Sequence, residues 1–334
     1  MGPARRSDRS RPDEPALIHD GAARGRPPQR SSVPREPLFL ACGRCYSEVV
    51  NLAVPAPLVD VDWLLAHARD PAVRIVDVRW YLAGKRGADE YARGHIPGAI
   101  FLDLDRDLSA PGRGPGRHPL PAIADFAAVL SRAGIGRDTI VVAYDDAGGS
   151  VAARLWWMLR WVGIEGARVL DGGLGAWIAA GQALSTEVPV IAPAPPLDLR
   201  AGTGARAIDK RDVQRLAAEP RALILDARAP ERFEGRVEPI DARPGHIPGA
   251  RSAPFAQNLV APGGALKPAG ELAQRYRALG AFDADDVVCY CGSGVTACHD
   301  ILALAIAGRG DVLLYEGSWS DWAADASLPA ATGP

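Results

Sequence analysis

Short apolar runs alternate with amphipathic segments along most of the chain. Residues 139–144 and 286–290 are short and rich in β-branched residues, as buried parallel strands are. Apolar positions recur at helical spacing in residues 123–132, 152–162 and 271–279. Strands that alternate with helices favour a parallel sheet joined by crossover helices. The pattern therefore predicts an α/β fold.

The same landmarks occur twice along the chain, in the same order. Four shared landmarks indicate a duplicated domain, so we expect two tandem domains, each a parallel sheet flanked by helices. The paired landmarks are Asp77-Val-Arg79 with Asp226-Ala-Arg228, His95-Ile-Pro-Gly-Ala99 with His246-Ile-Pro-Gly-Ala250, residues 139–144 with 286–290, and residues 171–177 with 315–322.

A proline-rich segment separates the two copies. Residues 185–196 include Val-Pro-Val-Ile-Ala-Pro-Ala-Pro-Pro, which disfavours a helix and suits an extended linker. We therefore expect the first domain at residues 58–184 and the second at residues 197–326. Residues 1–57, which begin with a stretch rich in Arg, Pro and Ser, are expected to form a disordered or poorly structured extension.

Composition and charge are typical of a soluble globular protein. The 38 Lys and Arg nearly balance the 40 Asp and Glu, so no global field draws the chain to nucleic acid or to a membrane. No apolar run reaches the ~18 residues that a membrane span needs, and residues 38–42 lie too late for a signal peptide. Three of the five cysteines cluster at 289–298, which is no disulfide framework, so we expect a cytoplasmic protein.

The two copies differ directly after the matched strands. The first continues with Asp145, and the second with Cys291-Gly-Ser-Gly-Val-Thr-Ala297. A strand, a glycine-rich turn and a helix place this loop at the carboxyl edge of the sheet, where open α/β folds bind ligands. Gly292 and Gly294 allow several N–H groups to point at one spot, and such donors favour a thiolate. The pattern predicts nucleophilic sulfur chemistry at Cys291.

Together, the repeated Asp-x-Arg and His-Ile-Pro-Gly-Ala motifs and the Cys-Gly-Ser-Gly-Val-Thr-Ala loop resemble the two-domain rhodanese and 3-mercaptopyruvate sulfurtransferase family. The resemblance covers residues 58–325. It implies an inactive first domain, an active second domain and a site in the cleft between them. The loop is more similar to the mercaptopyruvate branch, since thiosulfate rhodaneses carry basic residues where this chain has Gly292 and Ser293.

The implied activity is transfer of sulfane sulfur through a persulfide on Cys291. The donor is 3-mercaptopyruvate or, alternatively, thiosulfate, and the acceptor is a small thiophile such as cyanide or a thiol. A thioredoxin-like reductant is a further expected partner, and the reaction requires no metal and no cofactor.

The resemblance also implies a site for the donor carboxylate. Arg232 lies four residues past Arg228, where the family places a substrate arginine, and a guanidinium grips a carboxylate through two hydrogen bonds. A second arginine usually follows a Glu-Pro pair, but here Ile240 stands in that place. Arg236 and Arg243 are the possible substitutes, and the departure keeps thiosulfate open as the preferred donor.

A serine, histidine and aspartate relay is a third implication. Ser293, His118 and Asp105 match its positions, and a histidine with a pKa of ~6.5 exchanges protons near neutrality while a carboxylate fixes its tautomer. Further substrate-binding positions are expected in the loop at Gly292, Gly294, Val295 and Thr296.

Two other functions remain as alternatives to the sulfurtransferase. A cysteine phosphatase or arsenate reductase needs an arginine at the sixth position after its cysteine, and that position holds Ala297. A non-catalytic binding module suits the first domain alone, but Cys291 argues against it for the whole chain.

Several other residues are interpreted as structural. His95 and His246 have identical settings in both copies, including the copy without the cysteine, which favours a role in the turn. A single Cys42-Gly-Arg-Cys45 pair cannot complete a zinc site. Core or helix packing is expected for Cys289, Trp156, Trp157, Trp319 and Trp322. Cys298 lies about two helical turns beyond Cys291 and could form a regulatory disulfide with it only if the start of the helix moved.

Overall fold

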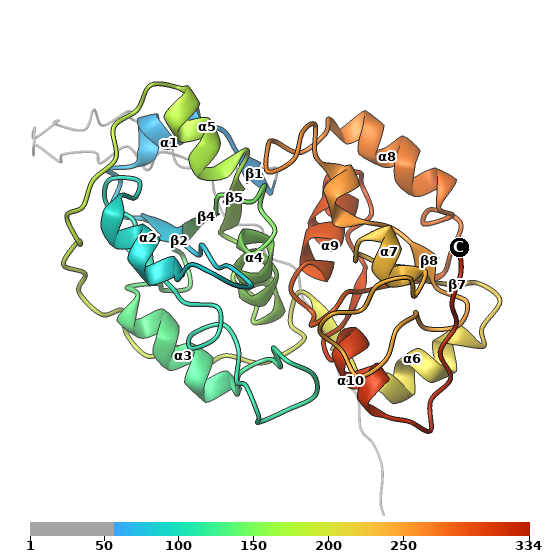
Figure 1. The fold of residues 1–334 in the computed structure, drawn as a ribbon. Coiled ribbons are helices and arrows are strands. Elements are labelled where there is room, and N and C mark those ends of the chain that lie inside the picture. The colour runs from blue at the N-terminus through green and yellow to red at the C-terminus, as the bar shows by residue number, and fades with distance from the viewer. Residues whose placement is uncertain (1–56) are drawn as a thin grey trace, which may run out of the picture. The chain divides into compact units, whose positions relative to one another are not determined.

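The computed structural model describes residues 57–334, which contain two five-stranded parallel sheets (Figure 1). The first sheet has the order β1-β5-β4-β2-β3 and the second the order β6-β10-β9-β7-β8, so the two copies share one topology. The strands are β1 (Leu58–Val59), β2 (Val73–Asp77), β3 (Ile100–Phe101), β4 (Ile140–Tyr144), β5 (Ala167–Leu170), β6 (Arg206–Ile208), β7 (Ala222–Asp226), β8 (Arg251–Ser252), β9 (Asp286–Tyr290) and β10 (Leu313–Tyr315). The predicted tandem α/β fold is confirmed.

Helices flank both sheets. Three of them, α3, α4 and α8, correspond to the segments with helical spacing, and their ends lie within two residues of the pattern. The helices are α1 (Val61–His67), α2 (Gly87–Arg93), α3 (Ile123–Arg132), α4 (Ala152–Trp161), α5 (Gly173–Ala179), α6 (Lys210–Ala217), α7 (Pro230–Phe233), α8 (Ala269–Ala278), α9 (Ala297–Ile306) and α10 (Ser318–Ala324), with a short 3₁₀ helix η1 (Phe255–Asn258).

Strands β4 and β9 lie in the middle of their sheets, which explains their continuous apolar runs. Every residue of β4 is buried, since helices cover both faces of a parallel sheet. The aromatic side chains of Trp156 and Trp157 are buried in α4, and Trp319 and Trp322 are buried in α10. These tryptophans and the buried Cys289 pack in the core, as predicted.

One hydrophobic cluster is shared by the two sheets, and each sheet has a further cluster of its own. Helices α4 and α9 pack against each other between them (Figure 1), and a single cluster of buried residues includes side chains of both halves. Polar contacts join the halves as well: the Leu266 N–H donates to Asp171, and the Leu120 N–H donates to Glu316. Residues 186–196, in the expected linker, form neither helix nor strand.

The repeated histidines occupy equivalent buried sites. His95 stacks on Tyr91 with ring centroids 3.9 Å apart, and His246 stacks on Phe233 at 3.7 Å. Each ring contacts a backbone carbonyl of the preceding helix through Nδ1. Both histidines therefore fix the turn before β3 or β8, in agreement with the structural interpretation.

Candidate active site

Cys291 begins the loop between β9 and α9. Its side chain is 2% exposed, and its backbone is held on both sides by the start of α10. The Cys291 N–H donates to Ser318 Oγ at 3.1 Å, and its carbonyl accepts from the Trp319 N–H at 2.9 Å. The Gly294 N–H donates to Cys291 Sγ at 3.1 Å, so one of the several N–H donors expected around the sulfur is in place.

Gly294 is required by its backbone conformation and close backbone contact, and Gly292 lies against two arginine side chains. Gly294 has φ +80°, and a Cβ there would lie 2.4 Å from the carbonyl oxygen of Glu316. A Cβ on Gly292 would lie 2.9 Å from Arg117 Nη2 and 3.3 Å from Arg232 Nη1. Larger residues would therefore displace the turn at Gly294 and two guanidinium groups at Gly292.

The matching loop of the first domain contains its own anion. The Asp145 carboxylate accepts backbone N–H groups from Ala147, Gly149, Val151 and Ala152, at 2.8 to 2.9 Å. A strand, loop and helix of this shape thus gather N–H donors around one negative charge. In the second domain the residue at the start of the loop is Cys291, so the corresponding position carries a thiol.

A cavity of about 340 Å³ opens over Cys291 and is lined by both domains. Of the residues predicted for the site, Asp105 and Gly294 do not line it, because Asp105 lies behind His118 and Gly294 packs on Glu316. Its lining residues are Trp80, Leu82, Arg117, His118, Ser150, Val151, Ala227, Arg228, Ala229, Arg232, Ile240, Phe255, Cys291, Gly292, Ser293, Val295 and Thr296.

Three predicted residues form a hydrogen-bonded chain at the edge of this cavity. His118 Nδ1 lies 2.8 Å from Ser293 Oγ, and His118 Nε2 lies 3.0 Å from Asp105 Oδ1. The indole N–H of Trp80 donates to the other Asp105 oxygen at 2.8 Å. The structure therefore brings Ser293 of the second domain together with His118 and Asp105 of the first.

The direction of these hydrogen bonds follows from the chemistry of the groups. Burial lowers the pKa of His118 below its ordinary value of 6.5, although Asp105 opposes the shift, so the ring is neutral at neutral pH. An ionised carboxylate only accepts hydrogen bonds, so Nε2 donates to Asp105 and Nδ1 accepts from Ser293. The arrangement leaves His118 ready to take a proton through Ser293.

Arginines also border the cavity. Arg232 does so as predicted, and Arg117 and Arg228 join it. The expectation that Arg236 or Arg243 replaces a missing arginine is wrong, because neither lines the cavity. Arg236 bends back to Glu234, and Arg243 donates to the carbonyls of Trp322 and Asp325. Sequence reasoning missed Arg117 as a residue of the cavity. Its position directly before His118 is the sequence feature that could have indicated it.

Two further residues hold the site together. Arg154 of α4 is fully buried and donates to the carbonyls of Gly294, at 3.1 Å, and His118, at 3.0 Å. Ser318 has φ 53°, an uncommon value for a residue with a side chain, and Gly173 has the same value in the first copy. Gly173 at the position equivalent to Ser318 is therefore the feature of the sequence that indicates a positive φ angle at this point of both domains.

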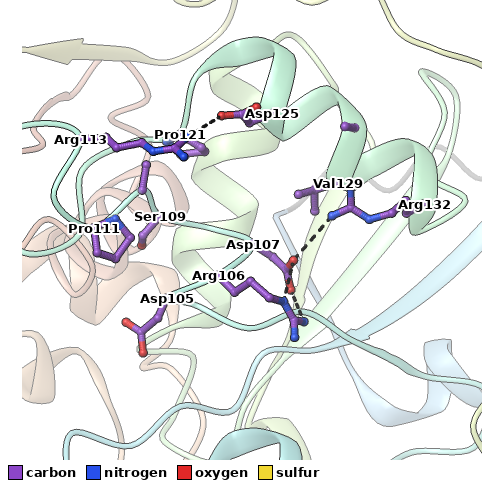
Figure 2. Close-up of a pocket in the computed structure, with 12 residues that line it drawn as sticks. Asp105, Arg106, Asp107, Ser109, Pro111, Arg113, Pro121, Asp125, Val129 and Arg132 are labelled. Atoms are coloured by element: carbon purple, nitrogen blue, oxygen red, sulfur yellow. Dashed lines mark hydrogen bonds and ion pairs between the residues drawn. The ribbon is translucent and has the colours of Figure 1, made fainter.

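A second cavity, of about 410 Å³, lies on the first domain (Figure 2). Apart from Asp105, which pairs with His118, its charged side chains pair with one another: Arg106 and Arg132 approach Asp107 at 2.7 and 3.8 Å, and Arg113 approaches Asp125 at 3.5 Å. No cysteine lines this cavity, whereas Cys291 lines the cavity shared by the two domains.

The described side chains and helices also bear on metal binding and membrane crossing. Among residues 57–334, no group of three or more His, Cys, Asp or Glu side chains is placed to hold a metal ion. In the same part of the chain, no helix has both the length and the apolar character that crossing a membrane requires.

Comparison with known proteins identifies the family. A model of the rhodanese-like domain matches residues 60–180 and again residues 209–325. A Pseudomonas aeruginosa protein named "Probable 3-mercaptopyruvate sulfurtransferase" is 46% identical over 83% of this chain and 99% of its own length. A Mycobacterium tuberculosis protein named for thiosulfate sulfurtransferase activity is 41% identical over 80% of this chain and 94% of its own length.

The solved structures agree with these sequence relatives. The structure of 3-mercaptopyruvate sulfurtransferase from Leishmania major has a TM-score of 0.71 and 34% sequence identity, and the match covers 80% of this chain and 74% of that one. With a family model that matches both halves and relatives that cover most of its length, the chain belongs to the rhodanese-like family and is a sulfurtransferase enzyme.

Proposed function

We propose that the protein transfers sulfur from 3-mercaptopyruvate to a small acceptor through a persulfide on Cys291. The observation that supports this donor is the hydrogen-bonded chain of Ser293, His118 and Asp105 beside the cysteine loop. Such a chain moves protons, and 3-mercaptopyruvate is a donor whose reaction needs a proton moved.

The first half-reaction forms one S–S bond and breaks one C–S bond. The Cys291 thiolate attacks the donor sulfur, and the electron pair of the C–S bond passes to carbon as the enolate of pyruvate. His118 takes the thiol proton of the donor through Ser293, and the same proton then reaches the enolate carbon. The products are pyruvate and a Cys291 persulfide anion, so atoms and charge balance.

The second half-reaction restores the thiolate. Cyanide attacks the outer sulfur of the persulfide and leaves as thiocyanate, or a thiol takes the sulfur and leaves as its own persulfide. A thioredoxin-like dithiol suits the role of thiol acceptor, because its second thiol can then release the sulfur as sulfide. The three described cysteines are free thiols, which supports the cytoplasm as the compartment.

Thiosulfate is the second donor to consider. Ile240 lines the cavity where the resemblance would place a second arginine, and a relative carries the thiosulfate name. In that reaction sulfite leaves as a stable anion, so the relay has no proton to deliver. Steady-state kinetics of the wild type with both donors and cyanide as acceptor separates the two, and we expect the larger kcat/KM with 3-mercaptopyruvate.

Arg232→Ala should weaken turnover of 3-mercaptopyruvate. The guanidinium of Arg232 faces the loop at Gly292, so we expect it to bind the donor carboxylate. Losing a charge-assisted pair costs ~1.5 to 3 kcal/mol, which corresponds to a loss of about 10- to 150-fold in kcat/KM. Arg236→Ala is the matched control, because Arg236 lies outside the cavity. Unchanged kinetics of Arg232→Ala would place the carboxylate site elsewhere.

A further inference from the structure

Charged side chains of alternating sign form a continuous chain beside the cysteine loop. Arg228 pairs with Asp226 at 2.6 Å and with Glu238 at 3.3 Å. Arg232 pairs with Glu238 at 2.7 Å and with Asp241 at 2.9 Å, and Arg117 donates to the other oxygen of Asp241. In order, the chain consists of Asp226, Arg228, Glu238, Arg232, Asp241 and Arg117.

The carboxylates in this chain are shielded from water. The side chains of Asp226, Glu238 and Asp241 are 0%, 2% and 3% exposed, and their ion pairs are therefore weakly screened by solvent and salt. Each guanidinium in the chain is offset by one carboxylate. The three arginines that border the cavity thus supply no net positive charge to a bound donor.

The ion pairs nevertheless leave some N–H groups for a ligand. Asp241 binds Nη2 of Arg232 and Nη1 of Arg117. The other terminal nitrogens, Arg232 Nη1 and Arg117 Nη2, are the atoms that a Cβ on Gly292 would approach at 3.3 and 2.9 Å. These nitrogens face the loop of Cys291, so Asp241 orients two guanidinium groups toward one point and cancels part of their charge.

We propose that Asp241 is a specificity residue that makes the site select donors with one negative charge over donors with two. The inference rests on the proposed function of the same site. A monoanionic carboxylate gains directed hydrogen bonds from the two nitrogens. A dianion such as thiosulfate brings a second negative charge that no unpaired cation of the clamp offsets, and the buried Asp241 carboxylate repels it.

Asp241→Asn tests this proposal directly. The amide keeps the size of the side chain and can still accept a hydrogen bond from an arginine, but the clamp gains one net positive charge. We expect the ratio of kcat/KM for thiosulfate to kcat/KM for 3-mercaptopyruvate to rise at least about tenfold at low ionic strength. The gain should persist at moderate salt, because the Asp241 side chain is shielded from water and the removed charge is weakly screened.

Two further variants keep the test sharp. Glu234→Gln removes a carboxylate outside the cavity, one that is paired with the exposed Arg236, so it should leave the donor ratio unchanged. Ile240→Lys adds a positive charge to the cavity while Asp241 is kept. Ile240 is 36% exposed, so a lysine there can place its ammonium group in water, and the variant should raise the thiosulfate to 3-mercaptopyruvate ratio of kcat/KM.

The outcomes separate this proposal from the proposed function. If Asp241→Asn leaves the donor ratio unchanged while the wild type still transfers sulfur from 3-mercaptopyruvate, the specificity role of Asp241 is wrong and the proposed function stands. If the wild type transfers sulfur from neither donor, the proposed function itself fails. An equal loss with both donors in Asp241→Asn would reduce Asp241 to a structural role.

Discussion

Cys291→Ser is expected to abolish sulfur transfer, with a loss of kcat of at least about a thousandfold with either donor. A serine hydroxyl is the closest replacement in shape, so the loop held by Ser318 and Gly294 should remain intact. The hydroxyl is a poor nucleophile toward sulfur at neutral pH and cannot carry a persulfide. Thiocyanate formation from cyanide measures the loss.

Cys42→Ser and Cys45→Ser provide controls for this variant. Both cysteines lie outside the residues that the structure describes, and the sequence predicts no catalytic role for either. We therefore expect full activity from both variants. A loss of turnover in either control, or measurable turnover in Cys291→Ser, would move the reactive thiol away from Cys291.

His118→Ala and Ser293→Ala should damage one donor reaction selectively. We expect kcat with 3-mercaptopyruvate to fall by about 10² to 10⁴, as general acid and base catalysis typically contributes, and kcat with thiosulfate to fall much less. The reason is that pyruvate must take up a proton at carbon, whereas sulfite leaves as a stable anion. Parallel assays with the two donors measure the difference, and equal losses would mean that these residues only shape the loop.

The pH profile offers a second view of the same relay. Burial holds the pKa of His118 below 6.5, so the ring stays neutral, and able to accept a proton, down to a pH under that value. With 3-mercaptopyruvate, kcat/KM should therefore fall on acidification only below pH 6.5. In His118→Ala this acidic limb should be missing. A limb retained in that variant would show that another group titrates.

Local pattern was enough to predict the fold and the nucleophile. The strands and helices follow from apolar periodicity, the duplication from repeated motifs, and Cys291 from one loop that differs between the copies. The relay could be predicted only through family resemblance, because Ser293 and His118 are 175 residues apart and belong to different domains. The periodicity of apolar residues in the sequence gives no indication of the contact between Ser293 and His118.

The residues that sequence reasoning missed act through tertiary contacts. Arg154 appears in the sequence as one more residue of an amphipathic helix, and it joins the Gly294 and His118 segments only after α4 packs on α9. Asp241 offers no signal until the fold brings Arg117 and Arg232 to it. Arg243 was only a possible substitute that does not align cleanly with the family's arginine, and carbonyls near the end of α10 bind its guanidinium.

The central claim is that sulfur resides on Cys291 between the two half-reactions, and intact-protein mass spectrometry tests it most directly. Incubation of the wild type with 3-mercaptopyruvate alone should add the mass of a single sulfur atom, which peptide mapping should place on Cys291 and cyanide should remove. Cys291→Ser should show no added mass under the same conditions. An unmodified Cys291 in a wild-type enzyme that still produces pyruvate and thiocyanate, or an added sulfur that maps to another cysteine, would contradict the persulfide mechanism.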